Sequence, residues 1–309
     1  MFTHIAAELK ENLLKAVQEN PVQGLLLSGG LDSSILAFLN PNIKAITISL
    51  KSYGEDAKYS KKVAEFLNLK YYHSEIDIEE AIESIPEVIK ILNCFDPAIP
   101  NDLCVYFGLR KAKQIGIKKL MTGDGSDELF GGYSFMQDID MLNSYIKRII
   151  PFIQFSSSII GRSFNIKVYQ PYLNREIIDF ALNINSTIKI RQESDKIFGK
   201  WILRKAFEKS LPEEIIWQDK RALEYGSGMN ILREIISSRV NRAEFEREEK
   251  MGKIKFINRE HYFYYKIYMD IFEKIPTPKR DEKECPSCGA GMEKQAFHCR
   301  ICGNVLCTS

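Results

Sequence analysis

The sequence predicts an α/β protein built on a doubly wound parallel sheet. Short apolar runs, of the kind that form buried parallel strands, alternate with helical segments as far as residue 122. Strands that alternate with helices at this spacing favour a parallel sheet with helices on both faces. Two glycine-rich segments follow predicted strands, and ligands of such sheets bind beyond the carboxyl ends of the strands. We therefore expect a ligand site where these two segments meet.

The individual elements follow from hydrophobic periodicity. Apolar residues at helical spacing predict a first helix, which ends before Pro21. The predicted helices cover residues 3–19, 35–39, 57–68, 78–92 with a kink at Pro86, and 102–115. The predicted strands cover residues 25–27, 44–50, 70–76 and 118–122. An aromatic helix over residues 261–275 is expected to pack in the core of the second half of the chain.

Composition limits the class of protein. The 309 residues are 45% hydrophobic, which is enough for one large core or two ordinary domains. A formal net charge of +2 creates no overall field that would draw the protein to nucleic acid or to a membrane. No apolar run reaches the length of a membrane span, and the segment from Met1 to Asn20 has the pattern of an amphipathic helix. We therefore expect a cytoplasmic protein with no membrane partner.

The first glycine-rich segment, Ser28 to Ser34, links a predicted strand to a helix. Adjacent glycines allow a ligand to approach the backbone closely, and the helix N-terminus supplies N–H groups and a dipole that suit an anion. An ordinary serine-capped turn is the alternative for a lone Ser-Gly-Gly. The whole string resembles the S-G-G-x-D-S loop of the N-type ATP pyrophosphatases, or PP-loop enzymes, which split ATP to AMP and pyrophosphate. It is not a mononucleotide P-loop, because no Gly-Lys-Ser/Thr follows.

The second segment, Gly123 to Tyr133, holds three carboxylates within five residues. Such carboxylates repel one another unless a cation or polar groups offset their charge. A solvated acidic turn is the alternative. The string resembles the G-D/E-G-x-D-E-x-F-G-G-Y signature of the synthase domain of asparagine synthetases, and it follows the S-G-G-L-D-S-S loop in the order that this family shows. Weaker similarity continues to about Met229.

The resemblance implies a HUP-like fold whose synthase site binds ATP with Mg²⁺, adenylates a carboxylate and lets an amine displace AMP. By position, the pyrophosphate loop consists of Ser28, Gly29, Gly30, Asp32, Ser33 and Ser34. The positions that contact adenosine are Leu27, Ile48, Thr122 and Gly123. Mg²⁺ is assigned to Asp32 and Asp127, whose hard oxygens suit it. Asp124 is implied to position or deprotonate the amine, and Lys200 to stabilise the charge on the departing pyrophosphate.

The substrate side departs from the family pattern. The positions that differ are Tyr169, Asn174, Gln218 and Arg221, so the acceptor acid stays open. Family members usually begin with a glutaminase domain whose nucleophile is Cys at position two, whereas here Phe2 follows Met1. We therefore expect no fused glutaminase. The nitrogen would come from free ammonia, from a separate glutaminase subunit or from another amine.

Four cysteines near the C-terminus predict a zinc ribbon. Cys285 and Cys288 form one C-x-x-C-G sequence, and Cys299 and Cys302 form a second one ten residues after Gly289. Four thiolates close a tetrahedral shell, so the site is expected to be structural. His298 and Cys307 are neighbours that could replace a ligand. The stiff, charged segment over 276–284 predicts a linker, so the ribbon is expected to fold separately.

The predicted organisation is a synthase-like domain over residues 1–275, the linker over 276–284 and the zinc ribbon over 285–309. Within the first domain we expect a sheet core at about 20–135 and a helical part at about 136–275. The leading hypothesis is an AMP-forming amide ligase that joins a small-molecule carboxylate to ammonia or another amine. One alternative is a tRNA-modifying enzyme of the same activation chemistry, whose ribbon helps to bind tRNA or a protein acceptor. The other is a non-catalytic, nucleotide-binding regulator.

Overall fold

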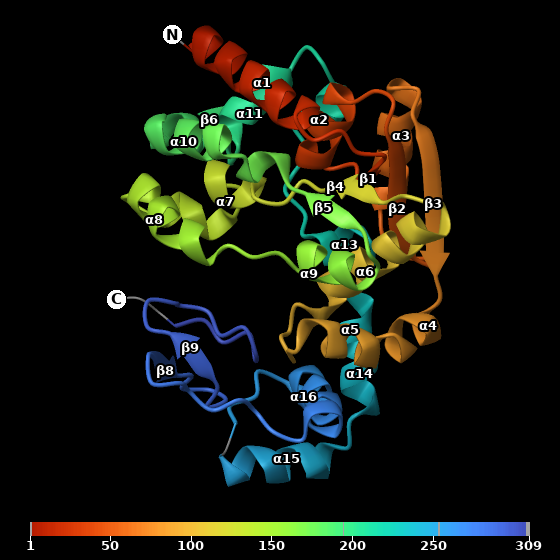
Figure 1. Ribbon diagram of the computed structural model, residues 1–309, viewed down its shortest axis with the longest axis vertical. Coiled ribbons are helices and arrows are strands. Elements are labelled where there is room, and N and C mark those ends of the chain that lie inside the picture. The colour runs from red at the N-terminus through yellow and green to blue at the C-terminus, as the bar shows by residue number, and fades with distance from the viewer. Residues whose placement is uncertain (1, 194, 253, 307–309) are drawn as a thin grey trace.

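The computed structural model describes residues 2–193, 195–252 and 254–306. Its centre is a parallel sheet of five strands in the order β3-β2-β1-β4-β5 (Figure 1). The strands are β1 (Gly24–Leu26), β2 (Lys44–Leu50), β3 (Lys70–Ile76), β4 (Lys119–Met121) and β5 (Lys167–Tyr169). The strand order reverses between β1 and β4, which pair directly. Ligands of doubly wound sheets bind at this reversal, and both glycine-rich segments begin there.

Helices cover both faces of the sheet, which confirms the predicted doubly wound arrangement. Side chains alternate across a strand, so Leu25 and Leu27 enter one core while Leu26 packs against the other. The first core lies under α1 (Phe2–Gln18), α2 (Leu31–Leu39) and α3 (Asp56–Phe66). The second lies under α5 (Ile85–Leu92), α6 (Ile99–Gln114) and α9 (Ser156–Ser163).

Two prolines set helix boundaries in the first half. The helix expected over 78–92 is two helices, α4 (Ile78–Glu83) and α5, which meet at Ser84. Pro86 lies in the first turn of α5, and Pro100 lies in the first turn of α6, which begins before the predicted residue 102. A proline is tolerated there because the first N–H groups of a helix have no partner within it.

The sheet extends beyond the range expected from the sequence, because β5 lies outside residues 20–135. Its pairing with β4 is bounded by two hydrogen bonds, from Lys167 N to Lys118 O over 2.9 Å and from Thr122 N to Tyr169 O over 3.0 Å. The three residues of β5 are too few to show an alternation of apolar and polar side chains. The strand is therefore recognised by its pairing with β4 and not by its own sequence pattern.

The described part of the second half is mostly helical, as expected. Its first helices are α7 (Ser126–Phe130), α8 (Leu142–Ile149), α10 (Arg175–Asn183), α11 (Trp201–Phe207) and α12 (Glu213–Ile216). They are followed by α13 (Leu223–Gly226), α14 (Ile231–Arg239), α15 (Arg242–Met251) and α16 (Arg259–Phe272). Short 3-10 helices lie at Ser134–Asp138, Ile150–Phe152, Pro171–Leu173 and Ser186–Ile188, and β6 (Arg191–Glu193) pairs with β7 (Lys196–Phe198). None of the helices described here is long and apolar enough to cross a membrane.

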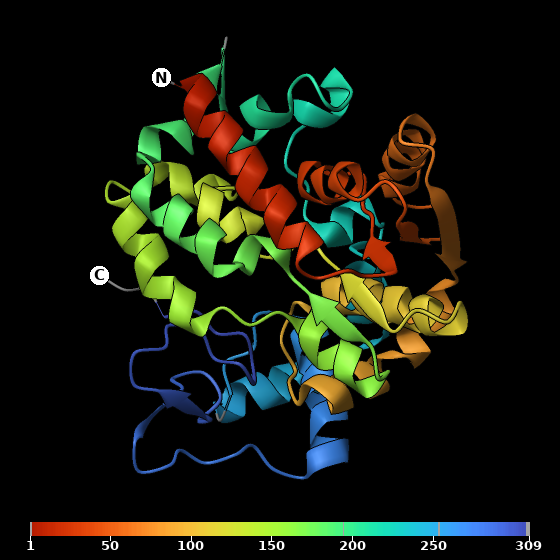
Figure 2. The same cartoon turned by 45° about the horizontal axis from the view of Figure 1, so that its top comes forward.

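The C-terminal ribbon is part of the main body. Its hairpin of β8 (Glu282–Glu284) and β9 (Gly291–Glu293) lies against the second half of the chain in both views (Figures 1 and 2). Phe95 N donates to Ile301 O over 2.7 Å, and Lys255 N donates to Ser287 O over 3.0 Å. The four ribbon cysteines share a buried core with Phe95 and Tyr268.

The structure differs from the expected linker at its C-terminal end, and the separate folding of the ribbon stays a prediction. β8 occupies the end of the segment assigned to the linker and pairs with β9, for example Lys283 with Met292. The ribbon completes its core with side chains of the main domain, because so short a segment buries too little apolar surface by itself.

Candidate active site

The loop from Ser28 to Gly30 leaves β1 and reaches the first turn of α2. Gly29 has a φ of +75°, and a Cβ at this position would lie 2.3 Å from Ser60 N, so only glycine fits. Ser28 Oγ accepts a hydrogen bond from Gly30 N over 3.2 Å and lies 3.1 Å from Ser33 Oγ. Gly30 caps α2 without a side-chain hydrogen bond, so the first N–H groups of the helix suit an anion.

The second glycine-rich segment follows β4 and meets the first. A Cβ on Gly123 would lie 3.1 Å from Asp32 Cβ, and Ser126 Oγ donates to Asp32 Oδ1 over 2.8 Å. At the other end of the segment, a Cβ on Gly132 would lie 1.8 Å from Asp127 Oδ1, which explains the glycine there. Two motifs that lie far apart in the sequence thus form one site.

Lys200 joins the two motifs. Its Nζ lies 2.8 Å from Asp32 Oδ2 and 2.8 Å from Asp127 Oδ1, and its side chain is 4% exposed. Burial alone would lower the pKa of Lys200, but the two carboxylates outweigh burial and raise the pKa above its ordinary value. Burial likewise favours the neutral form of Asp127, yet Lys200 and Lys220 hold its pKa below the ordinary value. Lys200 and Asp127 are therefore both charged at neutral pH.

The backbone conformation at Lys200 directs its side chain toward the second motif. Lys200 has a left-handed φ of +55°, and its N donates to Phe130 O over 3.0 Å. Phe130 ends α7, directly before Gly131 and Gly132. A non-glycine residue in this conformation carries strain, which proteins keep mainly where the surrounding structure fixes a functional side chain.

Asp124 is held by three donors. Its Oδ2 accepts from Thr122 Oγ1 over 2.7 Å, from Ser157 Oγ over 2.6 Å and from Gln170 Nε2 over 3.1 Å. Gln170 also donates to Ser157 Oγ over 3.0 Å. These bonds fix the orientation of the carboxylate between β4 and β5, so Asp124 can present its other oxygen to a substrate.

A cavity of about 200 Å³ opens between the two motifs, and it is called the nucleotide cavity below. Most residues assigned from the sequence lie in its wall: Leu27, Ser28, Gly30, Asp32, Ser33, Ile48, Thr122, Gly123, Asp124, Asp127 and Lys200. Gly29 and Ser34 are not part of the wall, because Gly29 packs on the backbone of Ser60 and Ser34 is fully buried in α2.

The wall also contains residues that sequence analysis did not assign to the site. They include Thr47, Asp56, Cys104, Val105, Arg204, Gln218, Lys220, Arg221 and Leu223. Gln218 and Lys220 belong to a segment with weak family similarity, which is the signal that could have found them. Asp56 gave no such signal. Burial raises the pKa of Asp56 to about 7, and the nearby positive charge of Arg221 offsets only part of this rise.

Two of the four departures from the family pattern lie in this cavity. Gln218 Nε2 donates to Gly29 O over 2.9 Å, and the Arg221 guanidinium carbon lies 4.4 Å from the centre of the Tyr59 ring. Tyr169 and Asn174 are outside the wall, and the side chain of Asn174 caps α10 by accepting from Glu176 N over 2.9 Å. Of the four departures, two therefore lie in the cavity, Tyr169 ends β5, and Asn174 caps a helix.

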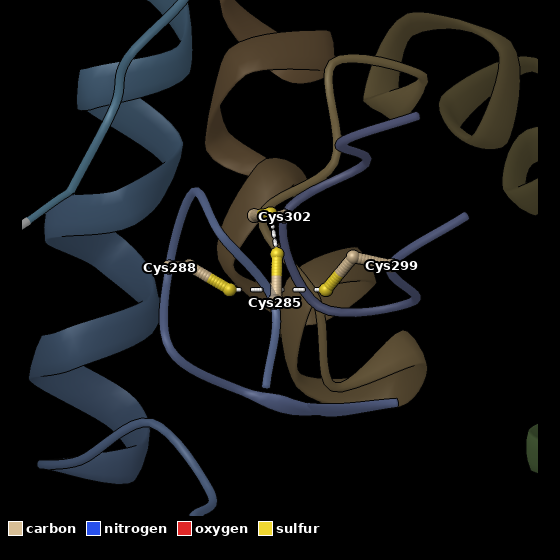
Figure 3. A group of neighbouring side chains, drawn as sticks. All are labelled: Cys285, Cys288, Cys299 and Cys302. Atoms are coloured by element: carbon tan, nitrogen blue, oxygen red, sulfur yellow. Dashed lines mark hydrogen bonds between the residues drawn. The ribbon is translucent and has the colours of Figure 1, made fainter. Parts of the chain in front are cut away.

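The four ribbon cysteines form a compact cluster of sulfurs (Figure 3). Their Sγ atoms all lie within 4.8 Å of one another, with 3.7 Å from Cys285 to Cys302 and 3.7 Å from Cys288 to Cys299. Four buried thiols at these distances fit a tetrahedral metal site. His298 turns away and pairs with Asp96, Nε2 to Oδ2 over 3.2 Å, and Cys307 lies outside the described residues.

Comparisons with known proteins agree with this geometry. The family profile for asparagine synthase matches residues 4–167 and 160–284. A probable glutamine-hydrolyzing asparagine synthetase of Dictyostelium discoideum is 28% identical over 308 residues, which cover 87% of this chain and 55% of that protein. Glutamine-hydrolyzing asparagine synthetase B of Escherichia coli is 24% identical and is matched over 54% of its length. The chain spans about half the length of the curated relatives it matches.

A solved structure, NMN synthetase of Francisella tularensis, aligns with 91% of this chain and 99% of its own at 14% identity and a TM-score of 0.41. A TM-score this low supports no inference about activity.

Proposed function

The chain belongs to the asparagine synthase family, and from this premise we propose that it is an ATP-dependent amide ligase. It would adenylate a carboxylate, releasing pyrophosphate, and then transfer the acyl group to ammonia or another amine, releasing AMP. The observation that carries the proposal is the Asp32–Lys200–Asp127 cluster, in which Lys200 lies 2.8 Å from each carboxylate at the junction of both motifs.

ATP would bind in this cavity with its phosphates at the start of α2. The N–H groups there and the ammonium groups of Lys200 and Lys220 supply the positive charge that a departing pyrophosphate needs. Apolar wall residues, such as Leu27, Ile48 and Val105, suit the adenosine. Asp124, fixed by its three hydrogen bonds, would orient the attacking amine or take its proton.

Mg²⁺ would be held by Asp32 and Asp127. Carboxylate oxygens are its preferred protein ligands, and an oxygen that already accepts one hydrogen bond keeps a second lone pair. The ion would neutralise charge on the phosphates of ATP. In the ribbon, the four cysteines would hold Zn²⁺, since a closed set of four thiolates is typical of structural zinc.

The products of ATP cleavage test the proposal. The purified chain with MgCl₂ should exchange labelled pyrophosphate into ATP when its carboxylate substrate is present, because adenylation is reversible. A screen of candidate acids, with AMP and pyrophosphate assayed as products, identifies that substrate. Formation of ADP and phosphate would contradict the assignment.

A second prediction concerns the nitrogen donor. These 309 residues are occupied by the synthase match and the ribbon, so they should use ammonium salts and fail to use glutamine. The rate with ammonium should rise as the pH is raised, because only the neutral form is nucleophilic. Amide formation measured with each donor over pH 6.5–9 checks this. Glutamine-dependent synthesis by the isolated chain, with no contaminating glutaminase, would show the prediction to be wrong.

The two alternative hypotheses make different predictions. A non-catalytic regulator does not need the charged Asp32–Lys200–Asp127 cluster, so its presence favours an enzyme. A tRNA acceptor would show binding that weakens steeply with salt, because phosphate contacts release counterions. A free acid would show little salt dependence. Pyrophosphate exchange stimulated by tRNA would therefore favour the tRNA-modifying alternative.

A further inference from the structure

A second cavity, of about 440 Å³, lies between the ribbon and the main domain. One wall comes from Glu128 and the segment 133–155, which includes α8, and the other comes from the ribbon segment 291–300 with Glu282. The ribbon lies beside α8 and the chain that follows it in both views (Figures 1 and 2). A water-sized molecule such as ammonia occupies about 30 Å³, so this cavity is far larger than ammonia needs.

Aromatic rings line both walls. Tyr133 stacks on Phe135 with ring centroids 5.7 Å apart, and Phe135 meets Tyr145 edge-on at 6.2 Å. Across the junction, Phe152 of the main domain meets Phe297 of the ribbon edge-on at 6.2 Å. Phe135 is 52% exposed, so part of its ring is accessible to a ligand. Such rings bind apolar groups, and their faces attract cations.

The walls carry charged groups of both signs, and His298, which also lines the cavity, pairs with Asp96. Among the described residues that line the cavity, the carboxylates are Glu128, Glu282 and Glu293, and the permanent cation is Arg300. Arg300 is engaged in the wall itself, where it donates to Gln154 Oε1 and, over 3.4 Å, to Phe152 O. Carboxylates and aromatic faces together attract an ammonium group and repel a second carboxylate. The wall therefore offers an amine both carboxylates and aromatic faces.

This cavity and the nucleotide cavity have neighbouring wall residues. Glu128 lines it and follows directly after Asp127 of the nucleotide cavity. Tyr133 OH donates to Glu128 Oε1 over 2.6 Å, and Lys220, which pairs with Asp127, lies 5.4 Å from the centre of the Tyr133 ring.

We propose that this ribbon-lined cavity binds the amine substrate, and that this substrate is a primary amine carried on an aromatic or bulky apolar body. The inference rests on the proposed ligase function and names the class of its nitrogen donor. The bound ammonium loses one proton to solvent, and its nitrogen lone pair forms a C–N bond to the acyl carbon. The bond from that carbon to the AMP oxygen breaks, AMP leaves, and the second proton passes from nitrogen to Asp124.

Direct binding tests the inference separately from the ligase reaction. Isothermal titration calorimetry of the full chain should show 2-phenylethylamine binding at least about tenfold more tightly than 2-phenylethanol or 3-phenylpropanoate, because only the amine is a cation. Phe135→Ala and Glu293→Gln should each reduce the affinity for 2-phenylethylamine by roughly three- to tenfold. The matched controls are Phe66→Ala, at an exposed phenylalanine of α3 outside both cavities, and Glu249→Gln, on α15. Both control variants should bind 2-phenylethylamine as tightly as the parent protein does.

Each outcome decides the question. Equal affinity for the amine and its uncharged analogue, or affinity unchanged by Phe135→Ala, would overturn the proposed site. Amide formation from ammonium at a rate that no aromatic amine exceeds would overturn the proposed substrate class. Pyrophosphate exchange measured without any amine reports the ligase function alone, so a chain that exchanges but binds no amine retains the proposed function and loses this inference.

Discussion

Replacing Asp127 by asparagine is expected to reduce pyrophosphate exchange by about 100- to 1000-fold, which is the effect of removing one preorganised electrostatic contact at an active site. Asparagine keeps the volume of the side chain but removes the charge that Lys200 and Lys220 share, at 2.8 and 3.2 Å. The remaining carboxylate, Asp32, would hold both Lys200 and the metal, so Mg²⁺ should also bind less tightly. Initial exchange rates measured over a range of MgCl₂ concentrations check both effects.

Lys200→Met tests the same cluster, and we expect it to reduce the folding stability more than Asp127→Asn does. It leaves two carboxylates near one another in a largely buried site, and breaking a buried pair in this way costs about 3–5 kcal/mol of folding free energy. The matched control is Lys205→Met on the same helix, whose ion pairs with Glu193 and Glu208 are partly exposed and worth less than about 1 kcal/mol. A folded Asp127→Asn protein whose exchange rate lies within tenfold of the parent would refute the assignment of this cluster to catalysis.

Loss of the ribbon metal is expected to destabilise the whole chain and not only the ribbon. The cysteine cluster shares a buried core with Phe95 and Tyr268, and Phe95 N is bonded to Ile301 O. Phe95 directly precedes the turn into α6, and α6 supplies Cys104 and Val105 to the nucleotide cavity. Cys299→Ser, or treatment with a strong chelator, should therefore cost at least about 3 kcal/mol and lower the melting temperature by roughly 6–12 °C.

Thermal unfolding followed by circular dichroism, with zinc content measured on the same samples, checks this result. Cys94→Ala is the matched control, because Cys94 is buried near the ribbon but does not belong to the four-cysteine cluster. A chelated protein that loses its metal yet unfolds at the parent temperature would show that the ribbon metal does not stabilise the rest of the chain. That result would support the prediction from sequence that the ribbon folds as a separate module.

Local sequence was sufficient for the elements of the first half. Strand-length segments and helical patterns located β1 to β4 and their intervening helices, because strands and helices alternate at regular spacing along this part of the chain. The glycines of both motifs also indicated close packing in the sequence. In the structure, a Cβ at Gly29 would collide with backbone, and a Cβ at Gly132 would collide with Asp127. The family resemblance then supplied roles for Asp32, Asp127 and Lys200 that no pattern could give.

Three features could not be read locally. β5 has three residues and exists through its pairing with β4. Asp56 enters the nucleotide cavity from α3, and no motif surrounds it. The second cavity joins the segment 133–155 to the ribbon segment 291–300, and nothing in either segment predicts the other.

The sequence by itself thus predicted the parts of this protein: a doubly wound sheet, a glycine-rich loop before a helix, a second glycine-rich motif with three carboxylates, and four grouped cysteines. Tertiary structure alone decided how these parts relate. It placed Lys200 between Asp32 and Asp127, and it merged the ribbon with the main core. The physical reason is that motif chemistry depends on a few neighbouring residues, whereas a buried ion pair, an edge strand or a shared core depends on partners that are distant in the chain.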